Sequence, residues 1–130
     1  MKAIFWTISA ALSLTAAPVV AAKAAPEARL AKALEGRIAG PPTRCIPLHQ
    51  IRSSEIFEKT AILYKAGSIW YVNRPASGAA FLDRGDILVT DTRSANLCNV
   101  DIVRLLDSGS RFPSGSLGLG DFIPYSRPRR

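Results

Sequence analysis

Acid–base chemistry in this chain would have to use either its one histidine or a pair of its 10 carboxylates. His49 is the side-chain type of a general base, but no second histidine and no Ser-His-Asp order accompanies it. We therefore expect His49 to have a hydrogen-bonded structural role on a strand. A small enzyme that uses His49 is the least favoured interpretation.

Two pairs of aspartates are close enough in sequence to be considered for catalysis. Asp83 and Asp86 flank an Arg-Gly dipeptide, a pattern typical of a turn in which aspartate binds the backbone. Asp91 and Asp101 are the second pair. We expect Asp101 to cap a turn or to pair with an arginine such as Arg52. Neither pair predicts acid–base catalysis.

The residues that could bind a cofactor or a metal have the wrong spacing. The Gly-rich stretch 115–120 matches neither G-x-G-x-x-G nor the P-loop pattern, and it predicts a flexible turn. The acidic residues are too dispersed for a calcium loop. One histidine and two distant cysteines are too few ligands for zinc. We expect no cofactor and no metal site.

Cys45 and Cys98 are the only cysteines. Neither belongs to a C-x-x-C motif, so a redox role is not favoured. An even count predicts pairing if the chain is exported, as its N-terminal residues predict below. A bridge between them would close a loop of about 54 residues, which the chain-entropy relation rates at about 4 kcal/mol. We expect a structural disulfide.

An aromatic side chain exposed beside polar residues is the best candidate for contact with a partner. Trp70 and Tyr71 are adjacent on a predicted strand, so they point to opposite faces, and Asn73 and Arg74 follow them. These four residues are the predicted contact surface. The alternative is that the aromatic side chains belong to the core.

Residues 23–42 predict a helix followed by a linker. Leu30, Leu34 and Ile38 recur every four residues, and the Gly-Pro-Pro sequence at 40–42 ends the pattern.

Residues 43–126 predict a β domain. The clearest element is a hairpin with strands 60–66 and 68–74, and its two largely apolar faces suggest that both are covered. Pro47 indicates an edge position or a bulge in the first strand. The other expected strands are 45–52, 86–92, 100–106 and 122–125, and the expected turns or loops are 53–59, 74–85 and 108–120. The pattern predicts a mainly β fold, a small antiparallel barrel or sandwich with one N-terminal α-helix and one disulfide.

The chain begins with the pattern of a secretory signal peptide. Lys2 precedes an apolar stretch at 3–14, and small residues follow it. Cleavage after Ala22 fits best, which makes residues 1–22 the signal peptide, and cleavage after Ala24 is second. An uncleaved anchor is the alternative, but Pro18 and interrupting Ser and Thr residues argue against it. We expect a periplasmic or secreted protein with no transmembrane anchor after processing.

The formal net charge of +7 restricts the partners. Nucleic acid is not expected, because the charge is scattered and no aromatic residues alternate with it. Residues 127–130 form a basic tail, which we expect to be a solvated end. The functional alternative is attraction to an anionic envelope surface or an acidic partner.

Several motifs together resemble a known family. They are Cys45-Ile46, Ile51-Arg52, Trp70-Tyr71-Val72-Asn73, Leu97-Cys98-Asn99-Val100-Asp101, Gly118-Leu119-Gly120 and Phe122-Ile123-Pro124-Tyr125. The chain resembles a family of small secreted proteobacterial proteins, mainly alphaproteobacterial, whose function is not assigned. Members of that family often carry a second cysteine pair, and this sequence has Ala79, Ala80 and Leu117 at those places.

The favoured interpretation of function is a non-enzymatic exported module that binds a protein or an envelope component. The signal peptide, the disulfide, the basic charge and the lack of a catalytic constellation support it. The alternative is an exported inhibitor of a hydrolase such as a protease, which would present a loop such as 74–83 on a rigid scaffold.

Overall fold

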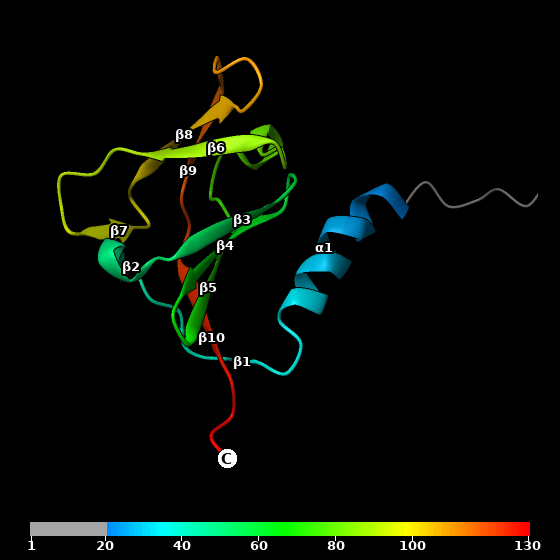
Figure 1. The fold of residues 1–130 in the computed structure, drawn as a ribbon, viewed down its shortest axis with the longest axis vertical. Helices are drawn as coiled ribbons and strands as arrows, with labels where there is room; N and C mark the ends of the chain where they lie inside the picture. The colour runs from blue at the N-terminus through cyan, green and yellow to red at the C-terminus, as the bar shows by residue number, and fades with distance from the viewer. Residues whose placement is uncertain (1–20) are drawn as a thin grey trace, which may run out of the picture.

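The computed structural model describes residues 21–130 (Figure 1). The predicted signal peptide, residues 1–22, therefore lies outside the described residues except for its last two. The elements of the described part are, in chain order, α1 (Ala21–Ala33), β1 (Ile38–Ala39), β2 (Cys45–Pro47), a 3-10 helix (Leu48–Gln50), β3 (Ser53–Phe57), β4 (Ala61–Ala66), β5 (Ile69–Asn73), a second 3-10 helix (Ala79–Phe81), β6 (Asp86–Thr90), β7 (Asn96–Cys98), β8 (Ile102–Asp107), β9 (Pro113–Gly118) and β10 (Phe122–Ser126).

The strands form three antiparallel sheets, which confirms the mainly β fold with one N-terminal helix. The largest sheet has the order β1-β10-β5-β4-β3, the second has the order β6-β8-β9, and β2 pairs with β7. The sheets do not close on one another. Within residues 21–130, strands β3 and β6 each lie at the edge of a sheet and pair with one neighbour only.

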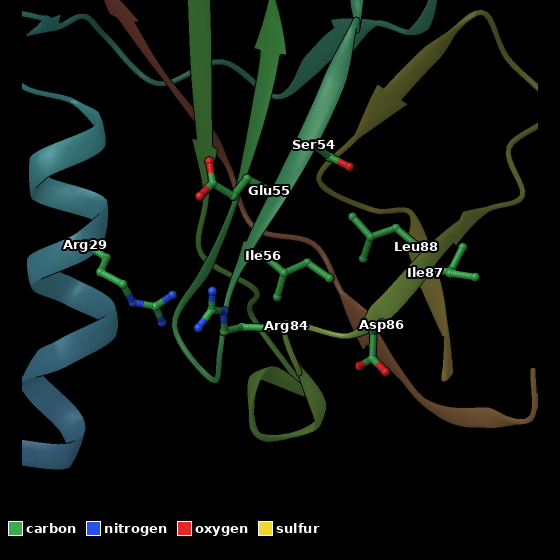
Figure 2. A pocket seen from close by; sticks show the side chains of 8 residues that line it. All are labelled: Arg29, Ser54, Glu55, Ile56, Arg84, Asp86, Ile87 and Leu88. Atoms are coloured by element: carbon green, nitrogen blue, oxygen red, sulfur yellow. The ribbon is translucent and has the colours of Figure 1, made fainter. Parts of the chain in front are cut away.

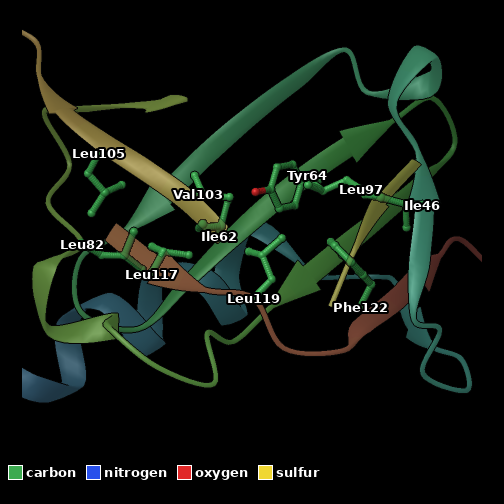
Figure 3. Packing of buried hydrophobic residues seen from close by; sticks show 10 residues of the cluster. All are labelled: Ile46, Ile62, Tyr64, Leu82, Leu97, Val103, Leu105, Leu117, Leu119 and Phe122. Atoms are coloured by element: carbon green, nitrogen blue, oxygen red, sulfur yellow. The ribbon is translucent and has the colours of Figure 1, made fainter. Parts of the chain in front are cut away.

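The core lies on both faces of the five-stranded sheet. One face meets the three-stranded sheet over the main apolar cluster (Figure 3), whose fully buried members are Ile46, Ile62, Tyr64, Leu82, Leu97, Val103, Leu105, Leu117, Leu119 and Phe122. On the other face, Leu30 of α1 packs with Phe57, Leu63 and Val72. This confirms the inference that both faces of the predicted hairpin are covered.

The hairpin β4–β5 is confirmed, with a two-residue loop between Ala66 and Ile69. Gly67 in this loop has a φ of +63°, a conformation that glycine adopts without the steric cost of a Cβ. The disulfide is also confirmed. Cys45 and Cys98 are directly opposite each other on β2 and β7, with their Cα atoms 4.0 Å apart.

The predicted helix boundary is wrong. The helix ends at Ala33, and Gly36 follows with a φ of +76°, a left-handed conformation typical of helix C-termini. Ile38, the last member of the expected apolar stripe, lies on β1 opposite Ser126 and is 60% exposed.

Two segments expected to be turns or loops are strands instead. The segment 53–59 contains β3, which pairs along its length with β4. The segment 108–120 contains β9, where Gly115 lets the Phe81 side chain approach the backbone, because a Cβ there would lie 2.8 Å from the Phe81 ring. Its end is also held by a bridge between Ser77 and Gly118.

The first predicted strand is shorter than expected, since Cys45–Pro47 gives way to the 3-10 helix Leu48–Gln50. Pro47 is the last residue of β2, which pairs with β7 alone, so both strands are edge strands. Proline favours such a position because it has no backbone N–H to donate. The short strand β7, Asn96–Cys98, was not expected at all.

Candidate functional site

Trp70 and Tyr71 point to opposite faces of β5, and both are half-buried. Tyr71 packs against the main cluster, with its ring edge-on to Phe122 at a centroid distance of 6.5 Å. Trp70 packs against the cluster beneath α1. The structure therefore gives both aromatic side chains a packing role, and only Trp70 is next to a concentration of charge.

Two cations contact the Trp70 ring. The guanidinium of Arg37 is 3.7 Å from the centroid of the indole ring, and the Lys65 ammonium is 4.7 Å from it. Arg37 also donates hydrogen bonds to the backbone oxygens of Ser68, at 3.0 Å, and Tyr125, at 3.4 Å. The indole face and these two carbonyls fix the guanidinium at the end of the sheet where the β4–β5 hairpin turns.

The other two members of the predicted contact surface have structural contacts. Asn73 is fully buried; its amide donates to the Gly120 oxygen at 2.7 Å and accepts from the Gly120 N–H at 3.0 Å. Its side chain is therefore unable to contact a partner, which corrects that part of the prediction. Arg74 is exposed and forms an ion pair with Glu27 of α1 at 2.6 Å, which lowers the pKa of Glu27 through a hydrogen bond.

The polar residues expected to have structural roles lie apart. Asp101 caps the turn after β7, because its carboxylate accepts the Cys98 N–H at 2.7 Å. The alternative, an ion pair with Arg52, is absent from the ion pairs of residues 21–130. His49 is exposed on the first 3-10 helix, not on a strand as expected, and lines a hollow of about 340 Å³ together with Arg52.

The first pair of aspartates considered for catalysis, Asp83 and Asp86, also has structural contacts. Asp83 and Asp86 form a turn, in which the Asp83 N–H donates to the Asp86 carboxylate at 3.1 Å and the Gly85 N–H donates to the Asp83 carboxylate at 3.3 Å. The segment 74–83, which was considered as the loop that an inhibitor would present to a protease, lies beside β9. Ala76 donates to the Gly118 oxygen at 2.9 Å there.

A second, larger hollow lies on the other side of the hairpin turn. It has a volume of about 690 Å³ and is lined by Arg37, Ile38, Ser68, Ile69, Ser126, Arg127, Pro128 and Arg129. The residues that line it include three arginines and, in the described part of the chain, no carboxylate. We call Arg37, Arg127 and Arg129, with Ile38 and Ile69, the basic end.

The electrostatics of the basic end favour an anion. Burial lowers the pKa of Arg37, and the nearby positive charge of Arg127 lowers it further. Arginine stays protonated at neutral pH, and the smaller of these two causes is repulsion between the guanidinium groups of Arg37 and Arg127. A bound anion would relieve that repulsion. Ile38, 60% exposed, and Ile69, 36% exposed, add apolar surface beside the charges.

The sequence did not reveal the basic end as a site. The sequence predicts a solvated tail at residues 127–130, with attraction to an anionic surface or an acidic partner as the alternative, and it places residue 37 in a helix. The three segments that build the site are separated by tens of residues and meet only because β10 lies between β1 and β5. The run of arginines after the last predicted strand was the one available signal.

Fold and site together define a small disulfide-bonded antiparallel β domain with a basic, partly apolar end. No family model matches the sequence, and no curated protein or solved structure matches it either. The resemblance to small secreted proteobacterial proteins therefore stays a prediction. Within residues 21–130, no helix is both long and apolar enough to cross a membrane. The same residues contain no cluster of His, Cys, Asp and Glu suited to a metal ion.

Proposed function

We propose that the chain is an exported, non-enzymatic module that associates with an anionic surface of the cell envelope through its basic end. The observation that carries the proposal is the hollow lined by Arg37, Arg127 and Arg129 together with two exposed isoleucines. A guanidinium group can donate two parallel hydrogen bonds to the oxygens of one phosphate or carboxylate. The isoleucines can enter the headgroup region of a membrane beside these contacts.

The exported location is supported by the sequence of residues 1–22 and by the disulfide. Disulfides persist in oxidising compartments such as the bacterial periplasm. The domain would meet anionic headgroups there, and each basic side chain near such a surface contributes about 1 kcal/mol of attraction.

The test is co-sedimentation of the processed chain with phosphatidylcholine vesicles that contain or lack phosphatidylglycerol. We expect binding only to the anionic vesicles, with a loss as salt is raised, because the Debye length falls from about 10 Å at 0.1 M to about 3 Å at 1 M. Equal sedimentation with both kinds of vesicle, or none with either, would contradict the proposal.

The protease-inhibitor alternative has no comparable support. An inhibitor of that kind presents a projecting loop, whereas the segment 74–83 is bonded through Ala76 and Ser77 to Gly118 at the end of β9.

A further inference from the structure

The free edges of β3 and β6 face each other across a third hollow, which is separate from the basic end. The hollow has a volume of about 450 Å³, and its walls include Ser54, Glu55 and Ile56 of β3 and Asp86, Ile87 and Leu88 of β6. Figure 2 shows Ile56 and Leu88 pointing toward the space between the two strands. We call this hollow the edge groove.

The register of the sheets determines which backbone groups face the edge groove on the β3 side. A two-residue hairpin loop makes Ala66 and Ile69 a hydrogen-bonded pair, and such pairs alternate along antiparallel strands. In β4, alternate residues therefore bond to β5, and those between them bond to β3. In β3, the partners of those β4 residues bond to β4, and the residues between them do not. The backbone N–H and C=O of Ser54 and Ile56 therefore point away from β4 and into the groove.

The same reasoning applies to β6. Ser108 donates to the Gly85 oxygen at 3.1 Å, which makes these residues a hydrogen-bonded pair at the start of the β6–β8 ladder. Two and four residues further along, Ile87 and Val89 bond to β8. The N–H and C=O of Leu88 are left facing the groove. Within residues 21–130, neither β3 nor β6 pairs with a further strand on this side.

The side chains at the edge groove determine the chemistry of an occupant. Ile56 and Leu88 are half-buried and pack against the main cluster, so the floor of the groove is apolar. The charged residues at its rim already have partners inside the chain, as the following contacts show: Arg29 and Arg84 contact Glu58 at 2.6 and 3.9 Å, Lys65 contacts Glu55 at 3.3 Å, and the Ser114 hydroxyl donates to Asp86 at 3.0 Å. The groove thus offers backbone hydrogen bonds and an apolar floor, and its charges are compensated.

We infer that the edge groove binds an extended segment of a partner polypeptide, with apolar side chains at alternate positions, by strand addition between β3 and β6. Its backbone would pair with Ser54 and Ile56 on one side and with Leu88 on the other. Alternate side chains would pack on Ile56 and Leu88, as in other complexes in which a peptide extends a sheet. Because such pairing uses main-chain groups, we expect the binding affinity to depend more on whether the peptide is extended than on its particular side chains.

The probe is a phage-displayed library of short random linear peptides, selected on the processed chain with its disulfide intact. We expect the enriched peptides to alternate apolar and polar residues. We also expect two sets of peptides to bind more weakly, one with backbone N-methyl groups at the odd-numbered positions and one with them at the even-numbered positions. Both should lose affinity because successive residues of an inserted strand bond to opposite neighbours. A library that yields no binder, or binders that tolerate N-methylation throughout, overturns the proposal.

A matched pair of variants locates the binding. Ser54→Pro removes one groove-facing N–H without removing a bond to β4, a place where an edge strand accepts proline, whereas Ser54→Ala keeps that N–H. We expect the selected peptides to bind Ser54→Pro about fivefold more weakly and Ser54→Ala unchanged, a ratio that corresponds to one hydrogen bond. Equal binding to both variants overturns the assignment to this edge. If Ser54→Pro does not fold, the N-methylated peptides decide the question.

Discussion

The guanidinium of Arg37 lies 3.7 Å from the centroid of the Trp70 ring, and this stack joins the N-terminal segment to the central strand β5. The arginine comes from the linker between α1 and β1, and Arg127 comes from the segment after β10. The indole face thus holds in place one of the charges that define the basic end.

Replacing Trp70 tests this stack. Trp70→Leu removes the aromatic face while keeping an apolar side chain, whereas Trp70→Phe keeps a smaller face. Since a cation–π contact contributes about 0.5–2 kcal/mol, we expect Trp70→Leu to be less stable than Trp70→Phe by about 1 kcal/mol in urea unfolding followed by circular dichroism. Two variants of equal stability would show that the stack contributes nothing.

Replacing Asn73 tests the buried link between β5 and the segment that precedes β10. Asn73→Ala leaves both the N–H and the C=O of Gly120, which is half-buried, without their partner, and each unsatisfied buried group costs about 1–3 kcal/mol. We expect a loss of about 2–4 kcal/mol in the free energy of unfolding. The control is Asn99→Ala, since Asn99 bonds to Asp121 at the surface and we expect a loss under about 1 kcal/mol. Equal losses in the two variants would contradict a stabilising role for the hydrogen bonds between Asn73 and Gly120.

Tyr64 offers a change expected to be neutral or stabilising. Its hydroxyl is buried without a hydrogen-bond partner among the described residues, and burial raises its pKa. Removing the unsatisfied group in Tyr64→Phe preserves the packing of the ring against Phe122, whose centroid is 5.9 Å away. We expect the free energy of unfolding to stay the same or to rise by about 1 kcal/mol. A loss above that size would show that the hydroxyl has a partner in solution.

The contact between α1 and the sheet should depend on pH through Glu27. Arg74 lowers the pKa of this carboxyl below its ordinary value of 4.5 in the folded chain. The ion pair therefore contributes stability above the unfolded pKa, and this contribution is lost as the pH falls through the folded pKa. The pair is half exposed, so its contribution is under about 1 kcal/mol.

Arg74→Gln should therefore differ most from the wild type well above pH 4.5 and converge with it in acid. Urea unfolding at a series of pH values measures this difference. The control is Arg104→Gln, because Arg104 is exposed and belongs to none of the ion pairs of residues 21–130. A constant difference between Arg74→Gln and the wild type at every pH would contradict the pairing.

Much of the fold follows from local sequence patterns. The hairpin β4–β5 was predicted because its apolar residues alternate and Gly67 provides the turn, and the disulfide because an exported chain with two cysteines has one way to pair them. The strand β9 was missed because Gly and Ser residues carry little apolar signal, and its pairing with β8 comes from tertiary contacts such as Phe81 on Gly115.

The candidate site was harder to predict than the fold. The spacing of Asn73 and Arg74 suggested a surface, but burial beside Gly120 and pairing with Glu27 depend on segments tens of residues away. The same is true of the basic end, where Arg37, Ile69 and Arg127 meet through strand order. Sequence patterns report local periodicity well, and they do not report which distant segments become neighbours.

The most direct test of the proposed function compares two double variants that lose the same charge at different places. Arg127→Gln/Arg129→Gln removes charge from the basic end, whereas Arg93→Gln/Arg104→Gln removes it from the loop after β6 and from β8, away from the C-terminus (Figure 1). In co-sedimentation with phosphatidylglycerol vesicles, we expect the first variant to bind about tenfold or more weakly, since each arginine contributes about 1 kcal/mol. We expect the second to bind nearly as the wild type does. Equal weakening of the two would show that net charge alone attracts the protein, and it would contradict the basic end as the binding surface.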